Sequence, residues 1–126
     1  MFFDYLNCEQ ILLSDYSLHD STIENIEYNH KTFSLKIVLS TTTNNSKASE
    51  TTIIEFMKLH YYSIDNTTII SKNCHNEING WRLLDYNEIS NFSKFVSTTP
   101  PIAVKFELFD LSKIIIICES INFERL

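Results

Sequence analysis

The chain has 126 residues and a formal net charge of −6, and 44% of its residues are apolar. This apolar content excludes a disordered chain, and the length favours one domain over residues 1–126. The acidic balance argues against nucleic acid and anionic membranes as partners, and the single glycine excludes a glycine-rich phosphate-binding loop.

The first forty residues predict a short helix followed by a hairpin. Residues 2–14 carry apolar side chains at helical spacing. Residues 17–28 fit a strand with a bulge, because Ile23 has the opposite parity from the apolar residues after it. Residues 29–32 are polar and turn-like, and residues 33–39 alternate apolar and polar side chains, as a half-buried strand does. The two strands are predicted to pair antiparallel.

The middle of the chain predicts a loop, a strand, a turn and a second helix. Residues 41–50 contain no large apolar side chain and predict an exposed, mobile loop. Residues 52–62 carry apolar side chains on both parities and fit a strand covered on both faces. The Asn-Gly pair at residues 79–80 favours a type I′ hairpin turn. A capped helix is expected to begin at Asp85 and end before Pro100.

The end of the chain reads as strand throughout. Residues 102–108 place four apolar side chains on one face, and residues 110–113 form a plausible turn. Residues 114–118 are a continuous apolar run suited to a central strand, and residues 121–125 predict a short edge strand. The expected fold is mainly β (α+β), an antiparallel sheet of about six to eight strands, curved or half-barrel, with about one or two short helices.

The sequence predicts a cytoplasmic protein. Its three cysteines, Cys8, Cys74 and Cys118, are an odd number at wide spacings, which fits free thiols better than disulfides. The first residues lack the basic segment and apolar segment of a secretion signal. The longest aliphatic run, residues 114–117, is too short to span a bilayer.

Two adjacent pairs of residues carry side chains of types used in catalysis or metal binding. Cys74–His75 lacks the further Cys or His that zinc requires and the orienting partner that a nucleophile requires. His19 and Asp20 would point to opposite faces of a strand, and Asp20 is expected to accept backbone N–H bonds near the hairpin. A small hydrolase using His19 or His60 ranks lowest, because no base–nucleophile spacing supports it. We expect no catalytic, cofactor or metal site and no enzymatic activity.

A basic and aromatic surface for nucleic acid is conceivable only locally. Domains that bind nucleic acid usually carry an excess of basic residues, and this chain carries the reverse. We therefore expect the aromatic residues of this set to belong to the core. The set is Lys58, Lys72, Arg82 and Lys94 with Tyr61, Tyr62 and Trp81.

All of the net negative charge lies in the first thirty residues, because the first basic residue is Lys31 and later charges cancel. A one-sided acidic field accelerates association with a cationic partner and repels nucleic acid. The same six carboxylates can also form a solvated surface without a partner. The residues predicted to bind a partner are Asp15, Asp20, Glu24 and Glu27.

Several stretches of the chain share a pattern with a known family. They are Leu18-His19-Asp20-Ser21 with Ile23 and Ile26, then Leu35–Leu39, and Phe106–Asp110 leading into Lys113–Cys118. These stretches resemble the opening and the final hairpin of small bacterial immunity proteins, which neutralise polymorphic toxins such as those of contact-dependent growth inhibition. The resemblance implies a cytoplasmic, non-enzymatic, β-rich domain that binds one cognate toxin. It assigns no interface residue, because the binding surfaces of immunity proteins vary.

The acidic segment and the resemblance lead to one hypothesis. The chain is expected to be an immunity protein that occludes the active site of a cationic toxin domain, such as a nuclease, without a cofactor. The alternative is a small-ligand-binding β domain with an apolar cavity lined by Phe and Tyr. Neither hypothesis involves nucleic acid or a membrane as a partner.

Overall fold

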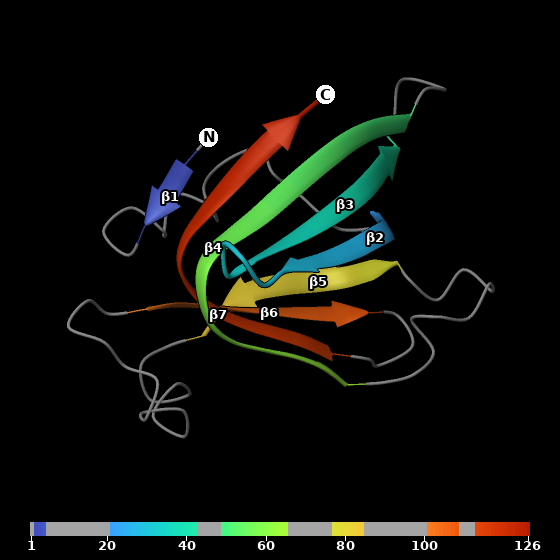
Figure 1. The fold of residues 1–126 in the computed structure, drawn as a ribbon. Coiled ribbons are helices and arrows are strands. Elements are labelled where there is room, and N and C mark those ends of the chain that lie inside the picture. Colours follow the sequence, from blue (N-terminus) through green and yellow to red (C-terminus); the bar gives the residue numbers. More distant parts are fainter. Residues whose placement is uncertain (1, 5–20, 43–48, 66–76, 85–100, 109–112) are drawn as a thin grey trace.

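The computed structural model describes residues 2–4, 21–42, 49–65, 77–84, 101–108 and 113–126 (Figure 1). Every regular element in these ranges is a β-strand, so the prediction of a mainly β, antiparallel fold is confirmed. The strands are β1 (Phe2–Asp4), β2 (Thr22–Asn29), β3 (Ser34–Thr42), β4 (Ser49–Asp65), β5 (Ile78–Leu83), β6 (Ile102–Leu108) and β7 (Lys113–Arg125).

The described ranges contain no helix. The helix expected over residues 2–14 is wrong at its start, where Phe2–Asp4 form β1 and pair with residues 120–122 of β7. The rest of that helix and the helix expected to begin at Asp85 lie outside the described residues.

The strands form one antiparallel sheet in the order β2-β3-β4-β7-β6-β5. β7 pairs along its whole length with β4. Its first half also pairs with β6, and its last residues pair with β1. Figure 1 shows β4 and β7 curving together across the molecule, with β2 and β3 beyond β4.

The sheet is open but curled until its two edge strands meet at one point. The backbone N–H of Ile78 donates to the carbonyl of Ser21 at 2.8 Å, and Thr22 forms an isolated bridge with Glu77. Figure 1 accordingly shows β2 beside β5. The concave side of the curled sheet therefore becomes an enclosed core.

Bulges bend the strands. β2 shifts register between Ile23 and Asn25, which confirms the bulge predicted from the parity of Ile23. β4 shifts against β7 between Leu59 and Tyr61, next to Lys58, whose φ of 54° is left-handed. A bulge increases local twist and bend, so β4 can serve both halves of the sheet.

The core lies on the concave face and is built around aromatic rings. Phe106 packs edge-on to Phe56 at 6.2 Å and stacks on Trp81 at 5.9 Å, and Trp81 also contacts Phe123. The predicted common face of residues 102–108 is confirmed, because its four apolar side chains are all buried. The buried residues of this core are Ile23, Leu35, Ile37, Leu39, Ile54, Phe56, Ile78, Ile102, Val104, Phe106, Leu108, Ile114, Ile116, Cys118, Ile121 and Phe123.

The centre of the sheet is covered on both faces. Ile116, Ile117 and Cys118 are consecutive in β7 and all buried, which confirms the predicted central strand. Ile117 packs with Ala103 in a second, smaller cluster on the opposite face from the main core. A side chain of Tyr61 adds to that cluster.

The Asn-Gly pair at residues 79–80 is not a hairpin turn. β5 continues through it, because Ile78 pairs with Leu108 and Gly80 pairs with Glu107 on the same neighbouring strand. The extra residue between these pairs makes a bulge. Gly80 does not have a positive φ, whereas a type I′ turn requires one at both central residues.

Three further predictions need correction. Residues 121–125 are no edge strand but continue β7 between β4 and β1. Phe33, expected on the buried side of its strand, lies in the turn before β3 with φ 51° and is 60% exposed. The loop expected over residues 41–50 is too long at both ends, because β3 extends to Thr42 and β4 begins at Ser49.

Candidate functional site

Two of the four residues predicted to bind a partner are described, and both are exposed on β2. Glu24 is the extra residue of the β2 bulge. Glu27 follows Ile26, which packs against the core, so the Glu27 carboxylate lies on the outer face of the sheet. Asp15 and Asp20 lie outside the described residues.

Glu27 belongs to a row of charged side chains that crosses three strands. Its register partner is Lys36 on β3, and Lys36 also pairs with Glu55 on β4. Opposite residues on neighbouring strands have Cβ atoms about 5 Å apart, so two carboxylates flank one ammonium group. The sequence could not reveal Glu55 as a neighbour of Glu27, because they are far apart in the chain.

An apolar strip lies in the next row of the same face. Val38 on β3 pairs with Ile53 on β4, and both side chains are half-buried. Glu124 on β7 is the other partner of Ile53. Carboxylates therefore border the strip. We call this surface the acidic outer face, made of Glu24, Glu27, Lys36, Val38, Ile53, Glu55 and Glu124.

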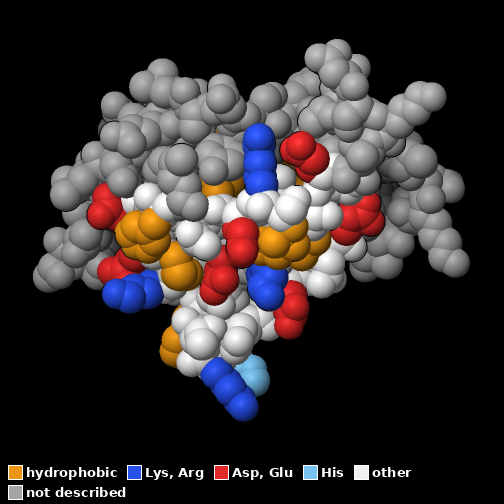
Figure 2. Space-filling model, turned by 90° about the horizontal axis from the view of Figure 1, so that it is seen from above, with side chains coloured by type: hydrophobic (Ala, Val, Ile, Leu, Met, Phe, Trp, Pro, Cys, Tyr) orange, Lys and Arg blue, Asp and Glu red, His pale blue; other side chains and the backbone are white. Residues whose placement is uncertain are grey.

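Figure 2 looks at the molecule from above in the view of Figure 1, the side where β3 and β4 lie. Acidic side chains there are interspersed with apolar patches across the middle of the visible face. The acidic outer face also contains a shallow depression of about 170 Å³. Its lining residues are Glu27, Asn29, Thr32, Ser34, Lys36 and Glu55.

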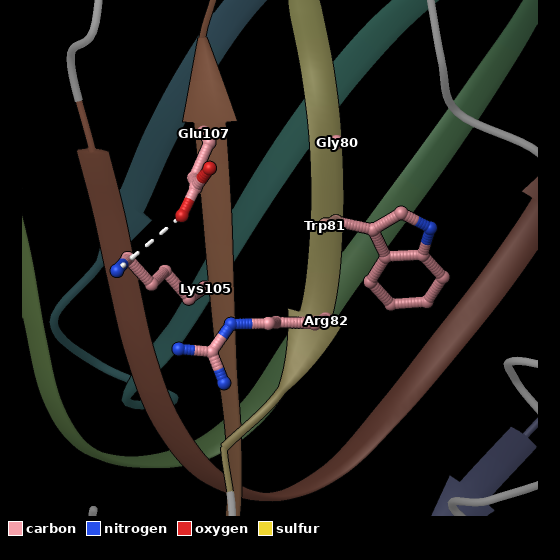
Figure 3. A pocket seen from close by; sticks show the side chains of 5 residues that line it. All are labelled: Gly80, Trp81, Arg82, Lys105 and Glu107. Carbon is pink, nitrogen blue, oxygen red and sulfur yellow. Dashed lines mark ion pairs between the residues drawn. The ribbon is translucent and has the colours of Figure 1, made fainter.

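A second depression, of about 280 Å³, lies between β5 and β6, and we call it the β5–β6 groove. Arg82 on β5 is the register partner of Lys105 on β6, and Gly80 is the partner of Glu107. The Lys105 Nζ lies 3.4 Å from the Glu107 Oε1. Trp81 also lines the groove, but its ring extends to the other side of β5 (Figure 3).

The structure does not assemble the basic and aromatic set weighed for nucleic acid. The Trp81 ring packs into the core, while the next residue, Arg82, points to the outer face. Tyr61 packs in the small cluster on the outer side, as expected for a packing residue. Lys72 and Lys94 lie outside the described residues.

His60 lies next to a carboxylate but makes no hydrogen bond to it. Its Nε2 is 4.0 Å from the Glu119 Oε1, which is too long for a hydrogen bond. Within the described residues this nitrogen is buried and has no hydrogen-bond partner. The arrangement therefore lacks the hydrogen-bonded geometry of an oriented general base. His19, the other histidine of that hypothesis, lies outside the described residues.

The described part of the chain holds no group of three His, Cys, Asp or Glu residues able to bind a metal ion. Cys118 is buried, and this burial raises the pKa of its thiol. A thiol in that state is protonated and a poor nucleophile. Cys74 and His75 lie outside the described residues.

Comparison with protein-family models, curated proteins and solved structures found no match to this chain. Among the described residues, no helix has the length and apolar character needed to cross a membrane. The two surfaces with distinctive chemistry are therefore the acidic outer face on β2, β3 and β4 and the β5–β6 groove.

Proposed function

We propose that the chain is an immunity protein that binds a cationic toxin domain through the acidic outer face and occludes the toxin's active site in the cytoplasm. The observation that carries the proposal is the row Glu27–Lys36–Glu55, in which carboxylates from two separate strands flank a single ammonium group. Such a row attracts basic side chains at a fixed spacing. The resemblance of the hairpin segments to immunity proteins supports the class of partner.

The composition of the face supports a protein partner over a dissolved ion. Half-buried Val38 and Ile53 lie between the carboxylates and offer apolar area at the centre of the surface. Protein interfaces commonly combine an apolar centre with a polar, charged rim. A stable specific complex would bury roughly 1,200–2,000 Å² in total. Many toxin domains are nucleases, whose phosphate-binding sites attract carboxylates.

The test is binding to a toxin domain encoded next to this chain, measured as association and dissociation rates at several salt concentrations. Glu27→Lys is expected to slow association about tenfold at low salt and to flatten its salt dependence. Glu107→Lys is the matched control, because Glu107 is also exposed but lies on β6. Melting curves of both variants check that they are folded.

Two results would count against the proposal. The first is the absence of a complex with the neighbouring toxin domain at micromolar concentration. The second is an equal effect of Glu27→Lys and Glu107→Lys, which would reduce the role of the face to net charge. The neighbouring gene itself is informative, since a locus without a toxin domain removes the expected partner.

The ligand-binding alternative stays a prediction. It requires an apolar cavity with a few convergent polar groups. The two depressions lined by described residues are open and bordered by charged side chains, so they do not favour it. The large side chains Phe56, Phe106 and Phe123 fill the described core.

A further inference from the structure

We propose that the β5–β6 groove binds a small molecule through an oxyanion, either a carboxylate or a phosphate group. The groove lies on the outer face of β5 and β6, and the sheet order separates it from β2 and β3. This inference does not depend on the proposed toxin partner.

The first support is a repulsive pair. Arg82 and Lys105 lie directly opposite each other on neighbouring strands. Like charges in this position destabilise a sheet. Glu107 offsets part of the repulsion by pairing with Lys105, but Lys113 on β7 lies opposite Glu107. Among these four described residues cations outnumber carboxylates, so an added anion would relieve the repulsion.

The second support is partial burial of the cation. The Lys105 side chain is only 17% exposed, whereas that of Glu107 is 48% exposed. Charges that are partly removed from water interact more strongly with a counter-ion than fully solvated charges do. The ammonium group of Lys105 is therefore a stronger anion ligand than a typical surface lysine.

The third support is the available space. Gly80 lines the groove, and a Cβ added to it would meet no atom within 4 Å. Figure 3 shows Arg82, Lys105 and Glu107 extending to the same side of the two strands, away from Trp81. The volume of about 280 Å³ is therefore bordered by charged groups and open to a ligand.

The chemistry of these side chains selects the ligand class. A guanidinium such as that of Arg82 presents a planar fork of donors that matches carboxylate and phosphate oxygens. The Glu107 carboxylate, beside Lys105, can accept a hydrogen bond from an O–H or N–H group of the same ligand. Because the volume is near the lower limit of ligand pockets, the ligand is small.

The test is a titration followed by backbone amide NMR shifts, with inorganic phosphate in one arm and acetate in the other. Sodium chloride keeps the ionic strength constant. We expect saturable shifts of the Gly80, Arg82 and Lys105 amides with a Kd of about 1–10 mM in at least one arm. Saturation by phosphate alone assigns a phosphate group, and saturation by acetate alone assigns a carboxylate.

Two variants separate the groove from a general charge effect. Lys105→Gln removes one cation, and Gly80→Val fills the groove without changing any charge. Each is expected to weaken binding at least about tenfold, which is about 1.4 kcal/mol. Lys36→Gln is the matched control on the acidic outer face and is expected to leave the Kd unchanged. Gly80→Ala replaces Gly80→Val if the larger side chain prevents folding.

The proposal is overturned if neither anion produces saturable shifts at these amides up to about 50 mM, well above the expected Kd. It is also overturned if chloride alone produces the same shifts. Equal weakening by Lys36→Gln and Lys105→Gln would likewise reduce the effect to net charge. None of these results bears on the toxin complex, since no protein partner is present.

Discussion

The backbone N–H of Ile78 and the backbone carbonyl of Ser21 form a 2.8 Å hydrogen bond that joins the two edge strands of the sheet. Both residues are fully buried. Buried backbone groups are almost always paired, because an unpaired one loses its hydrogen bonds to water. This contact therefore holds the curl of the sheet at one point.

The first prediction concerns hydrogen exchange at this contact. The amide of Ile78 is expected to exchange at least about 100-fold more slowly than an unstructured amide, equivalent to an opening free energy of about 2.7 kcal/mol. The amide of Lys31 is the comparison, because it donates only to the exposed Asn29 side chain, at 3.0 Å. If both amides exchange equally fast, the edges are not joined in solution.

The second prediction concerns Phe33, whose φ of 51° is costly for a residue with a side chain. Its ring is 60% exposed and contributes little packing. Phe33→Asn is expected to raise the free energy of unfolding by about 1 kcal/mol, because Asn tolerates the left-handed conformation. Urea denaturation measures the change.

Phe33→Ala is the control for this relief of strain. Alanine keeps the Cβ that makes the conformation unfavourable and offers no side-chain hydrogen bond. It is therefore expected to give no gain. A loss of stability in both variants would mean that the Phe33 ring contributes packing energy that its exposure does not suggest.

The third prediction concerns Gly80, the single glycine of the chain. It lies inside β5, has no positive φ, and a Cβ there meets nothing within 4 Å. Gly80→Ala is therefore expected to raise the free energy of unfolding by about 0.4–1 kcal/mol, since alanine restricts the unfolded chain. A lower melting temperature for Gly80→Ala would show that the β5 bulge needs glycine.

The fourth prediction is a loss of stability in alkali that depends on Cys118. Burial, with a smaller contribution from Glu119, raises the pKa of the Cys118 thiol far above its ordinary 9.0. Above pH 9 the unfolded chain therefore loses a proton that the folded chain keeps. The free energy of unfolding should fall by about 1.4 kcal/mol per pH unit there and be independent of this thiol below pH 9.

Denaturation by urea across this pH range, for the parent chain and for Cys118→Ala, isolates the effect from other groups that titrate in alkali. The difference between the two curves should be constant below pH 9 and should shrink above it. A difference that stays constant at all pH values would contradict a buried, protonated thiol. Replacing Cys8 and Cys74 by Ser allows a further check, in which Cys118 resists iodoacetamide until the chain is unfolded.

Local pattern predicted the hairpin of β2 and β3 and the buried face of β6, because burial on one face imposes a period of two on the side chains. Ile23 even predicted the position of the β2 bulge through its parity. The same rule failed at Phe33. Alternation alone does not show where a turn ends, and the strand begins one residue later.

Pairing between distant segments was beyond the reach of local pattern. The polar residues Glu119 and Ser120 suggested a break before residue 121, yet Ser120 pairs with Met57 on one side and Asp4 on the other. The Asn-Gly pair likewise suggested a turn, although β6 pairs with the residues on both sides of it.

The candidate sites show the same limit. Charge along the sequence predicted Glu24 and Glu27, but the contribution of Glu55 depends on β3 lying between β2 and β4. The β5–β6 groove was missed altogether. Its pair Arg82 and Lys105 becomes visible only when the register of the two strands is known.

The central place of β7 also sets the order in which the fold can form during synthesis. β2, β3 and β4 pair with one another as consecutive strands, and β5 pairs with β6, but only β7 connects these two groups along the main path of the sheet. Because residues 113–125 are the last of the seven strands to be translated, both groups must wait for them with apolar faces uncovered. Long-range strand pairing is slow to form and leaves such faces open to aggregation. Chains that stall on the ribosome before residue 113 should therefore depend on chaperones.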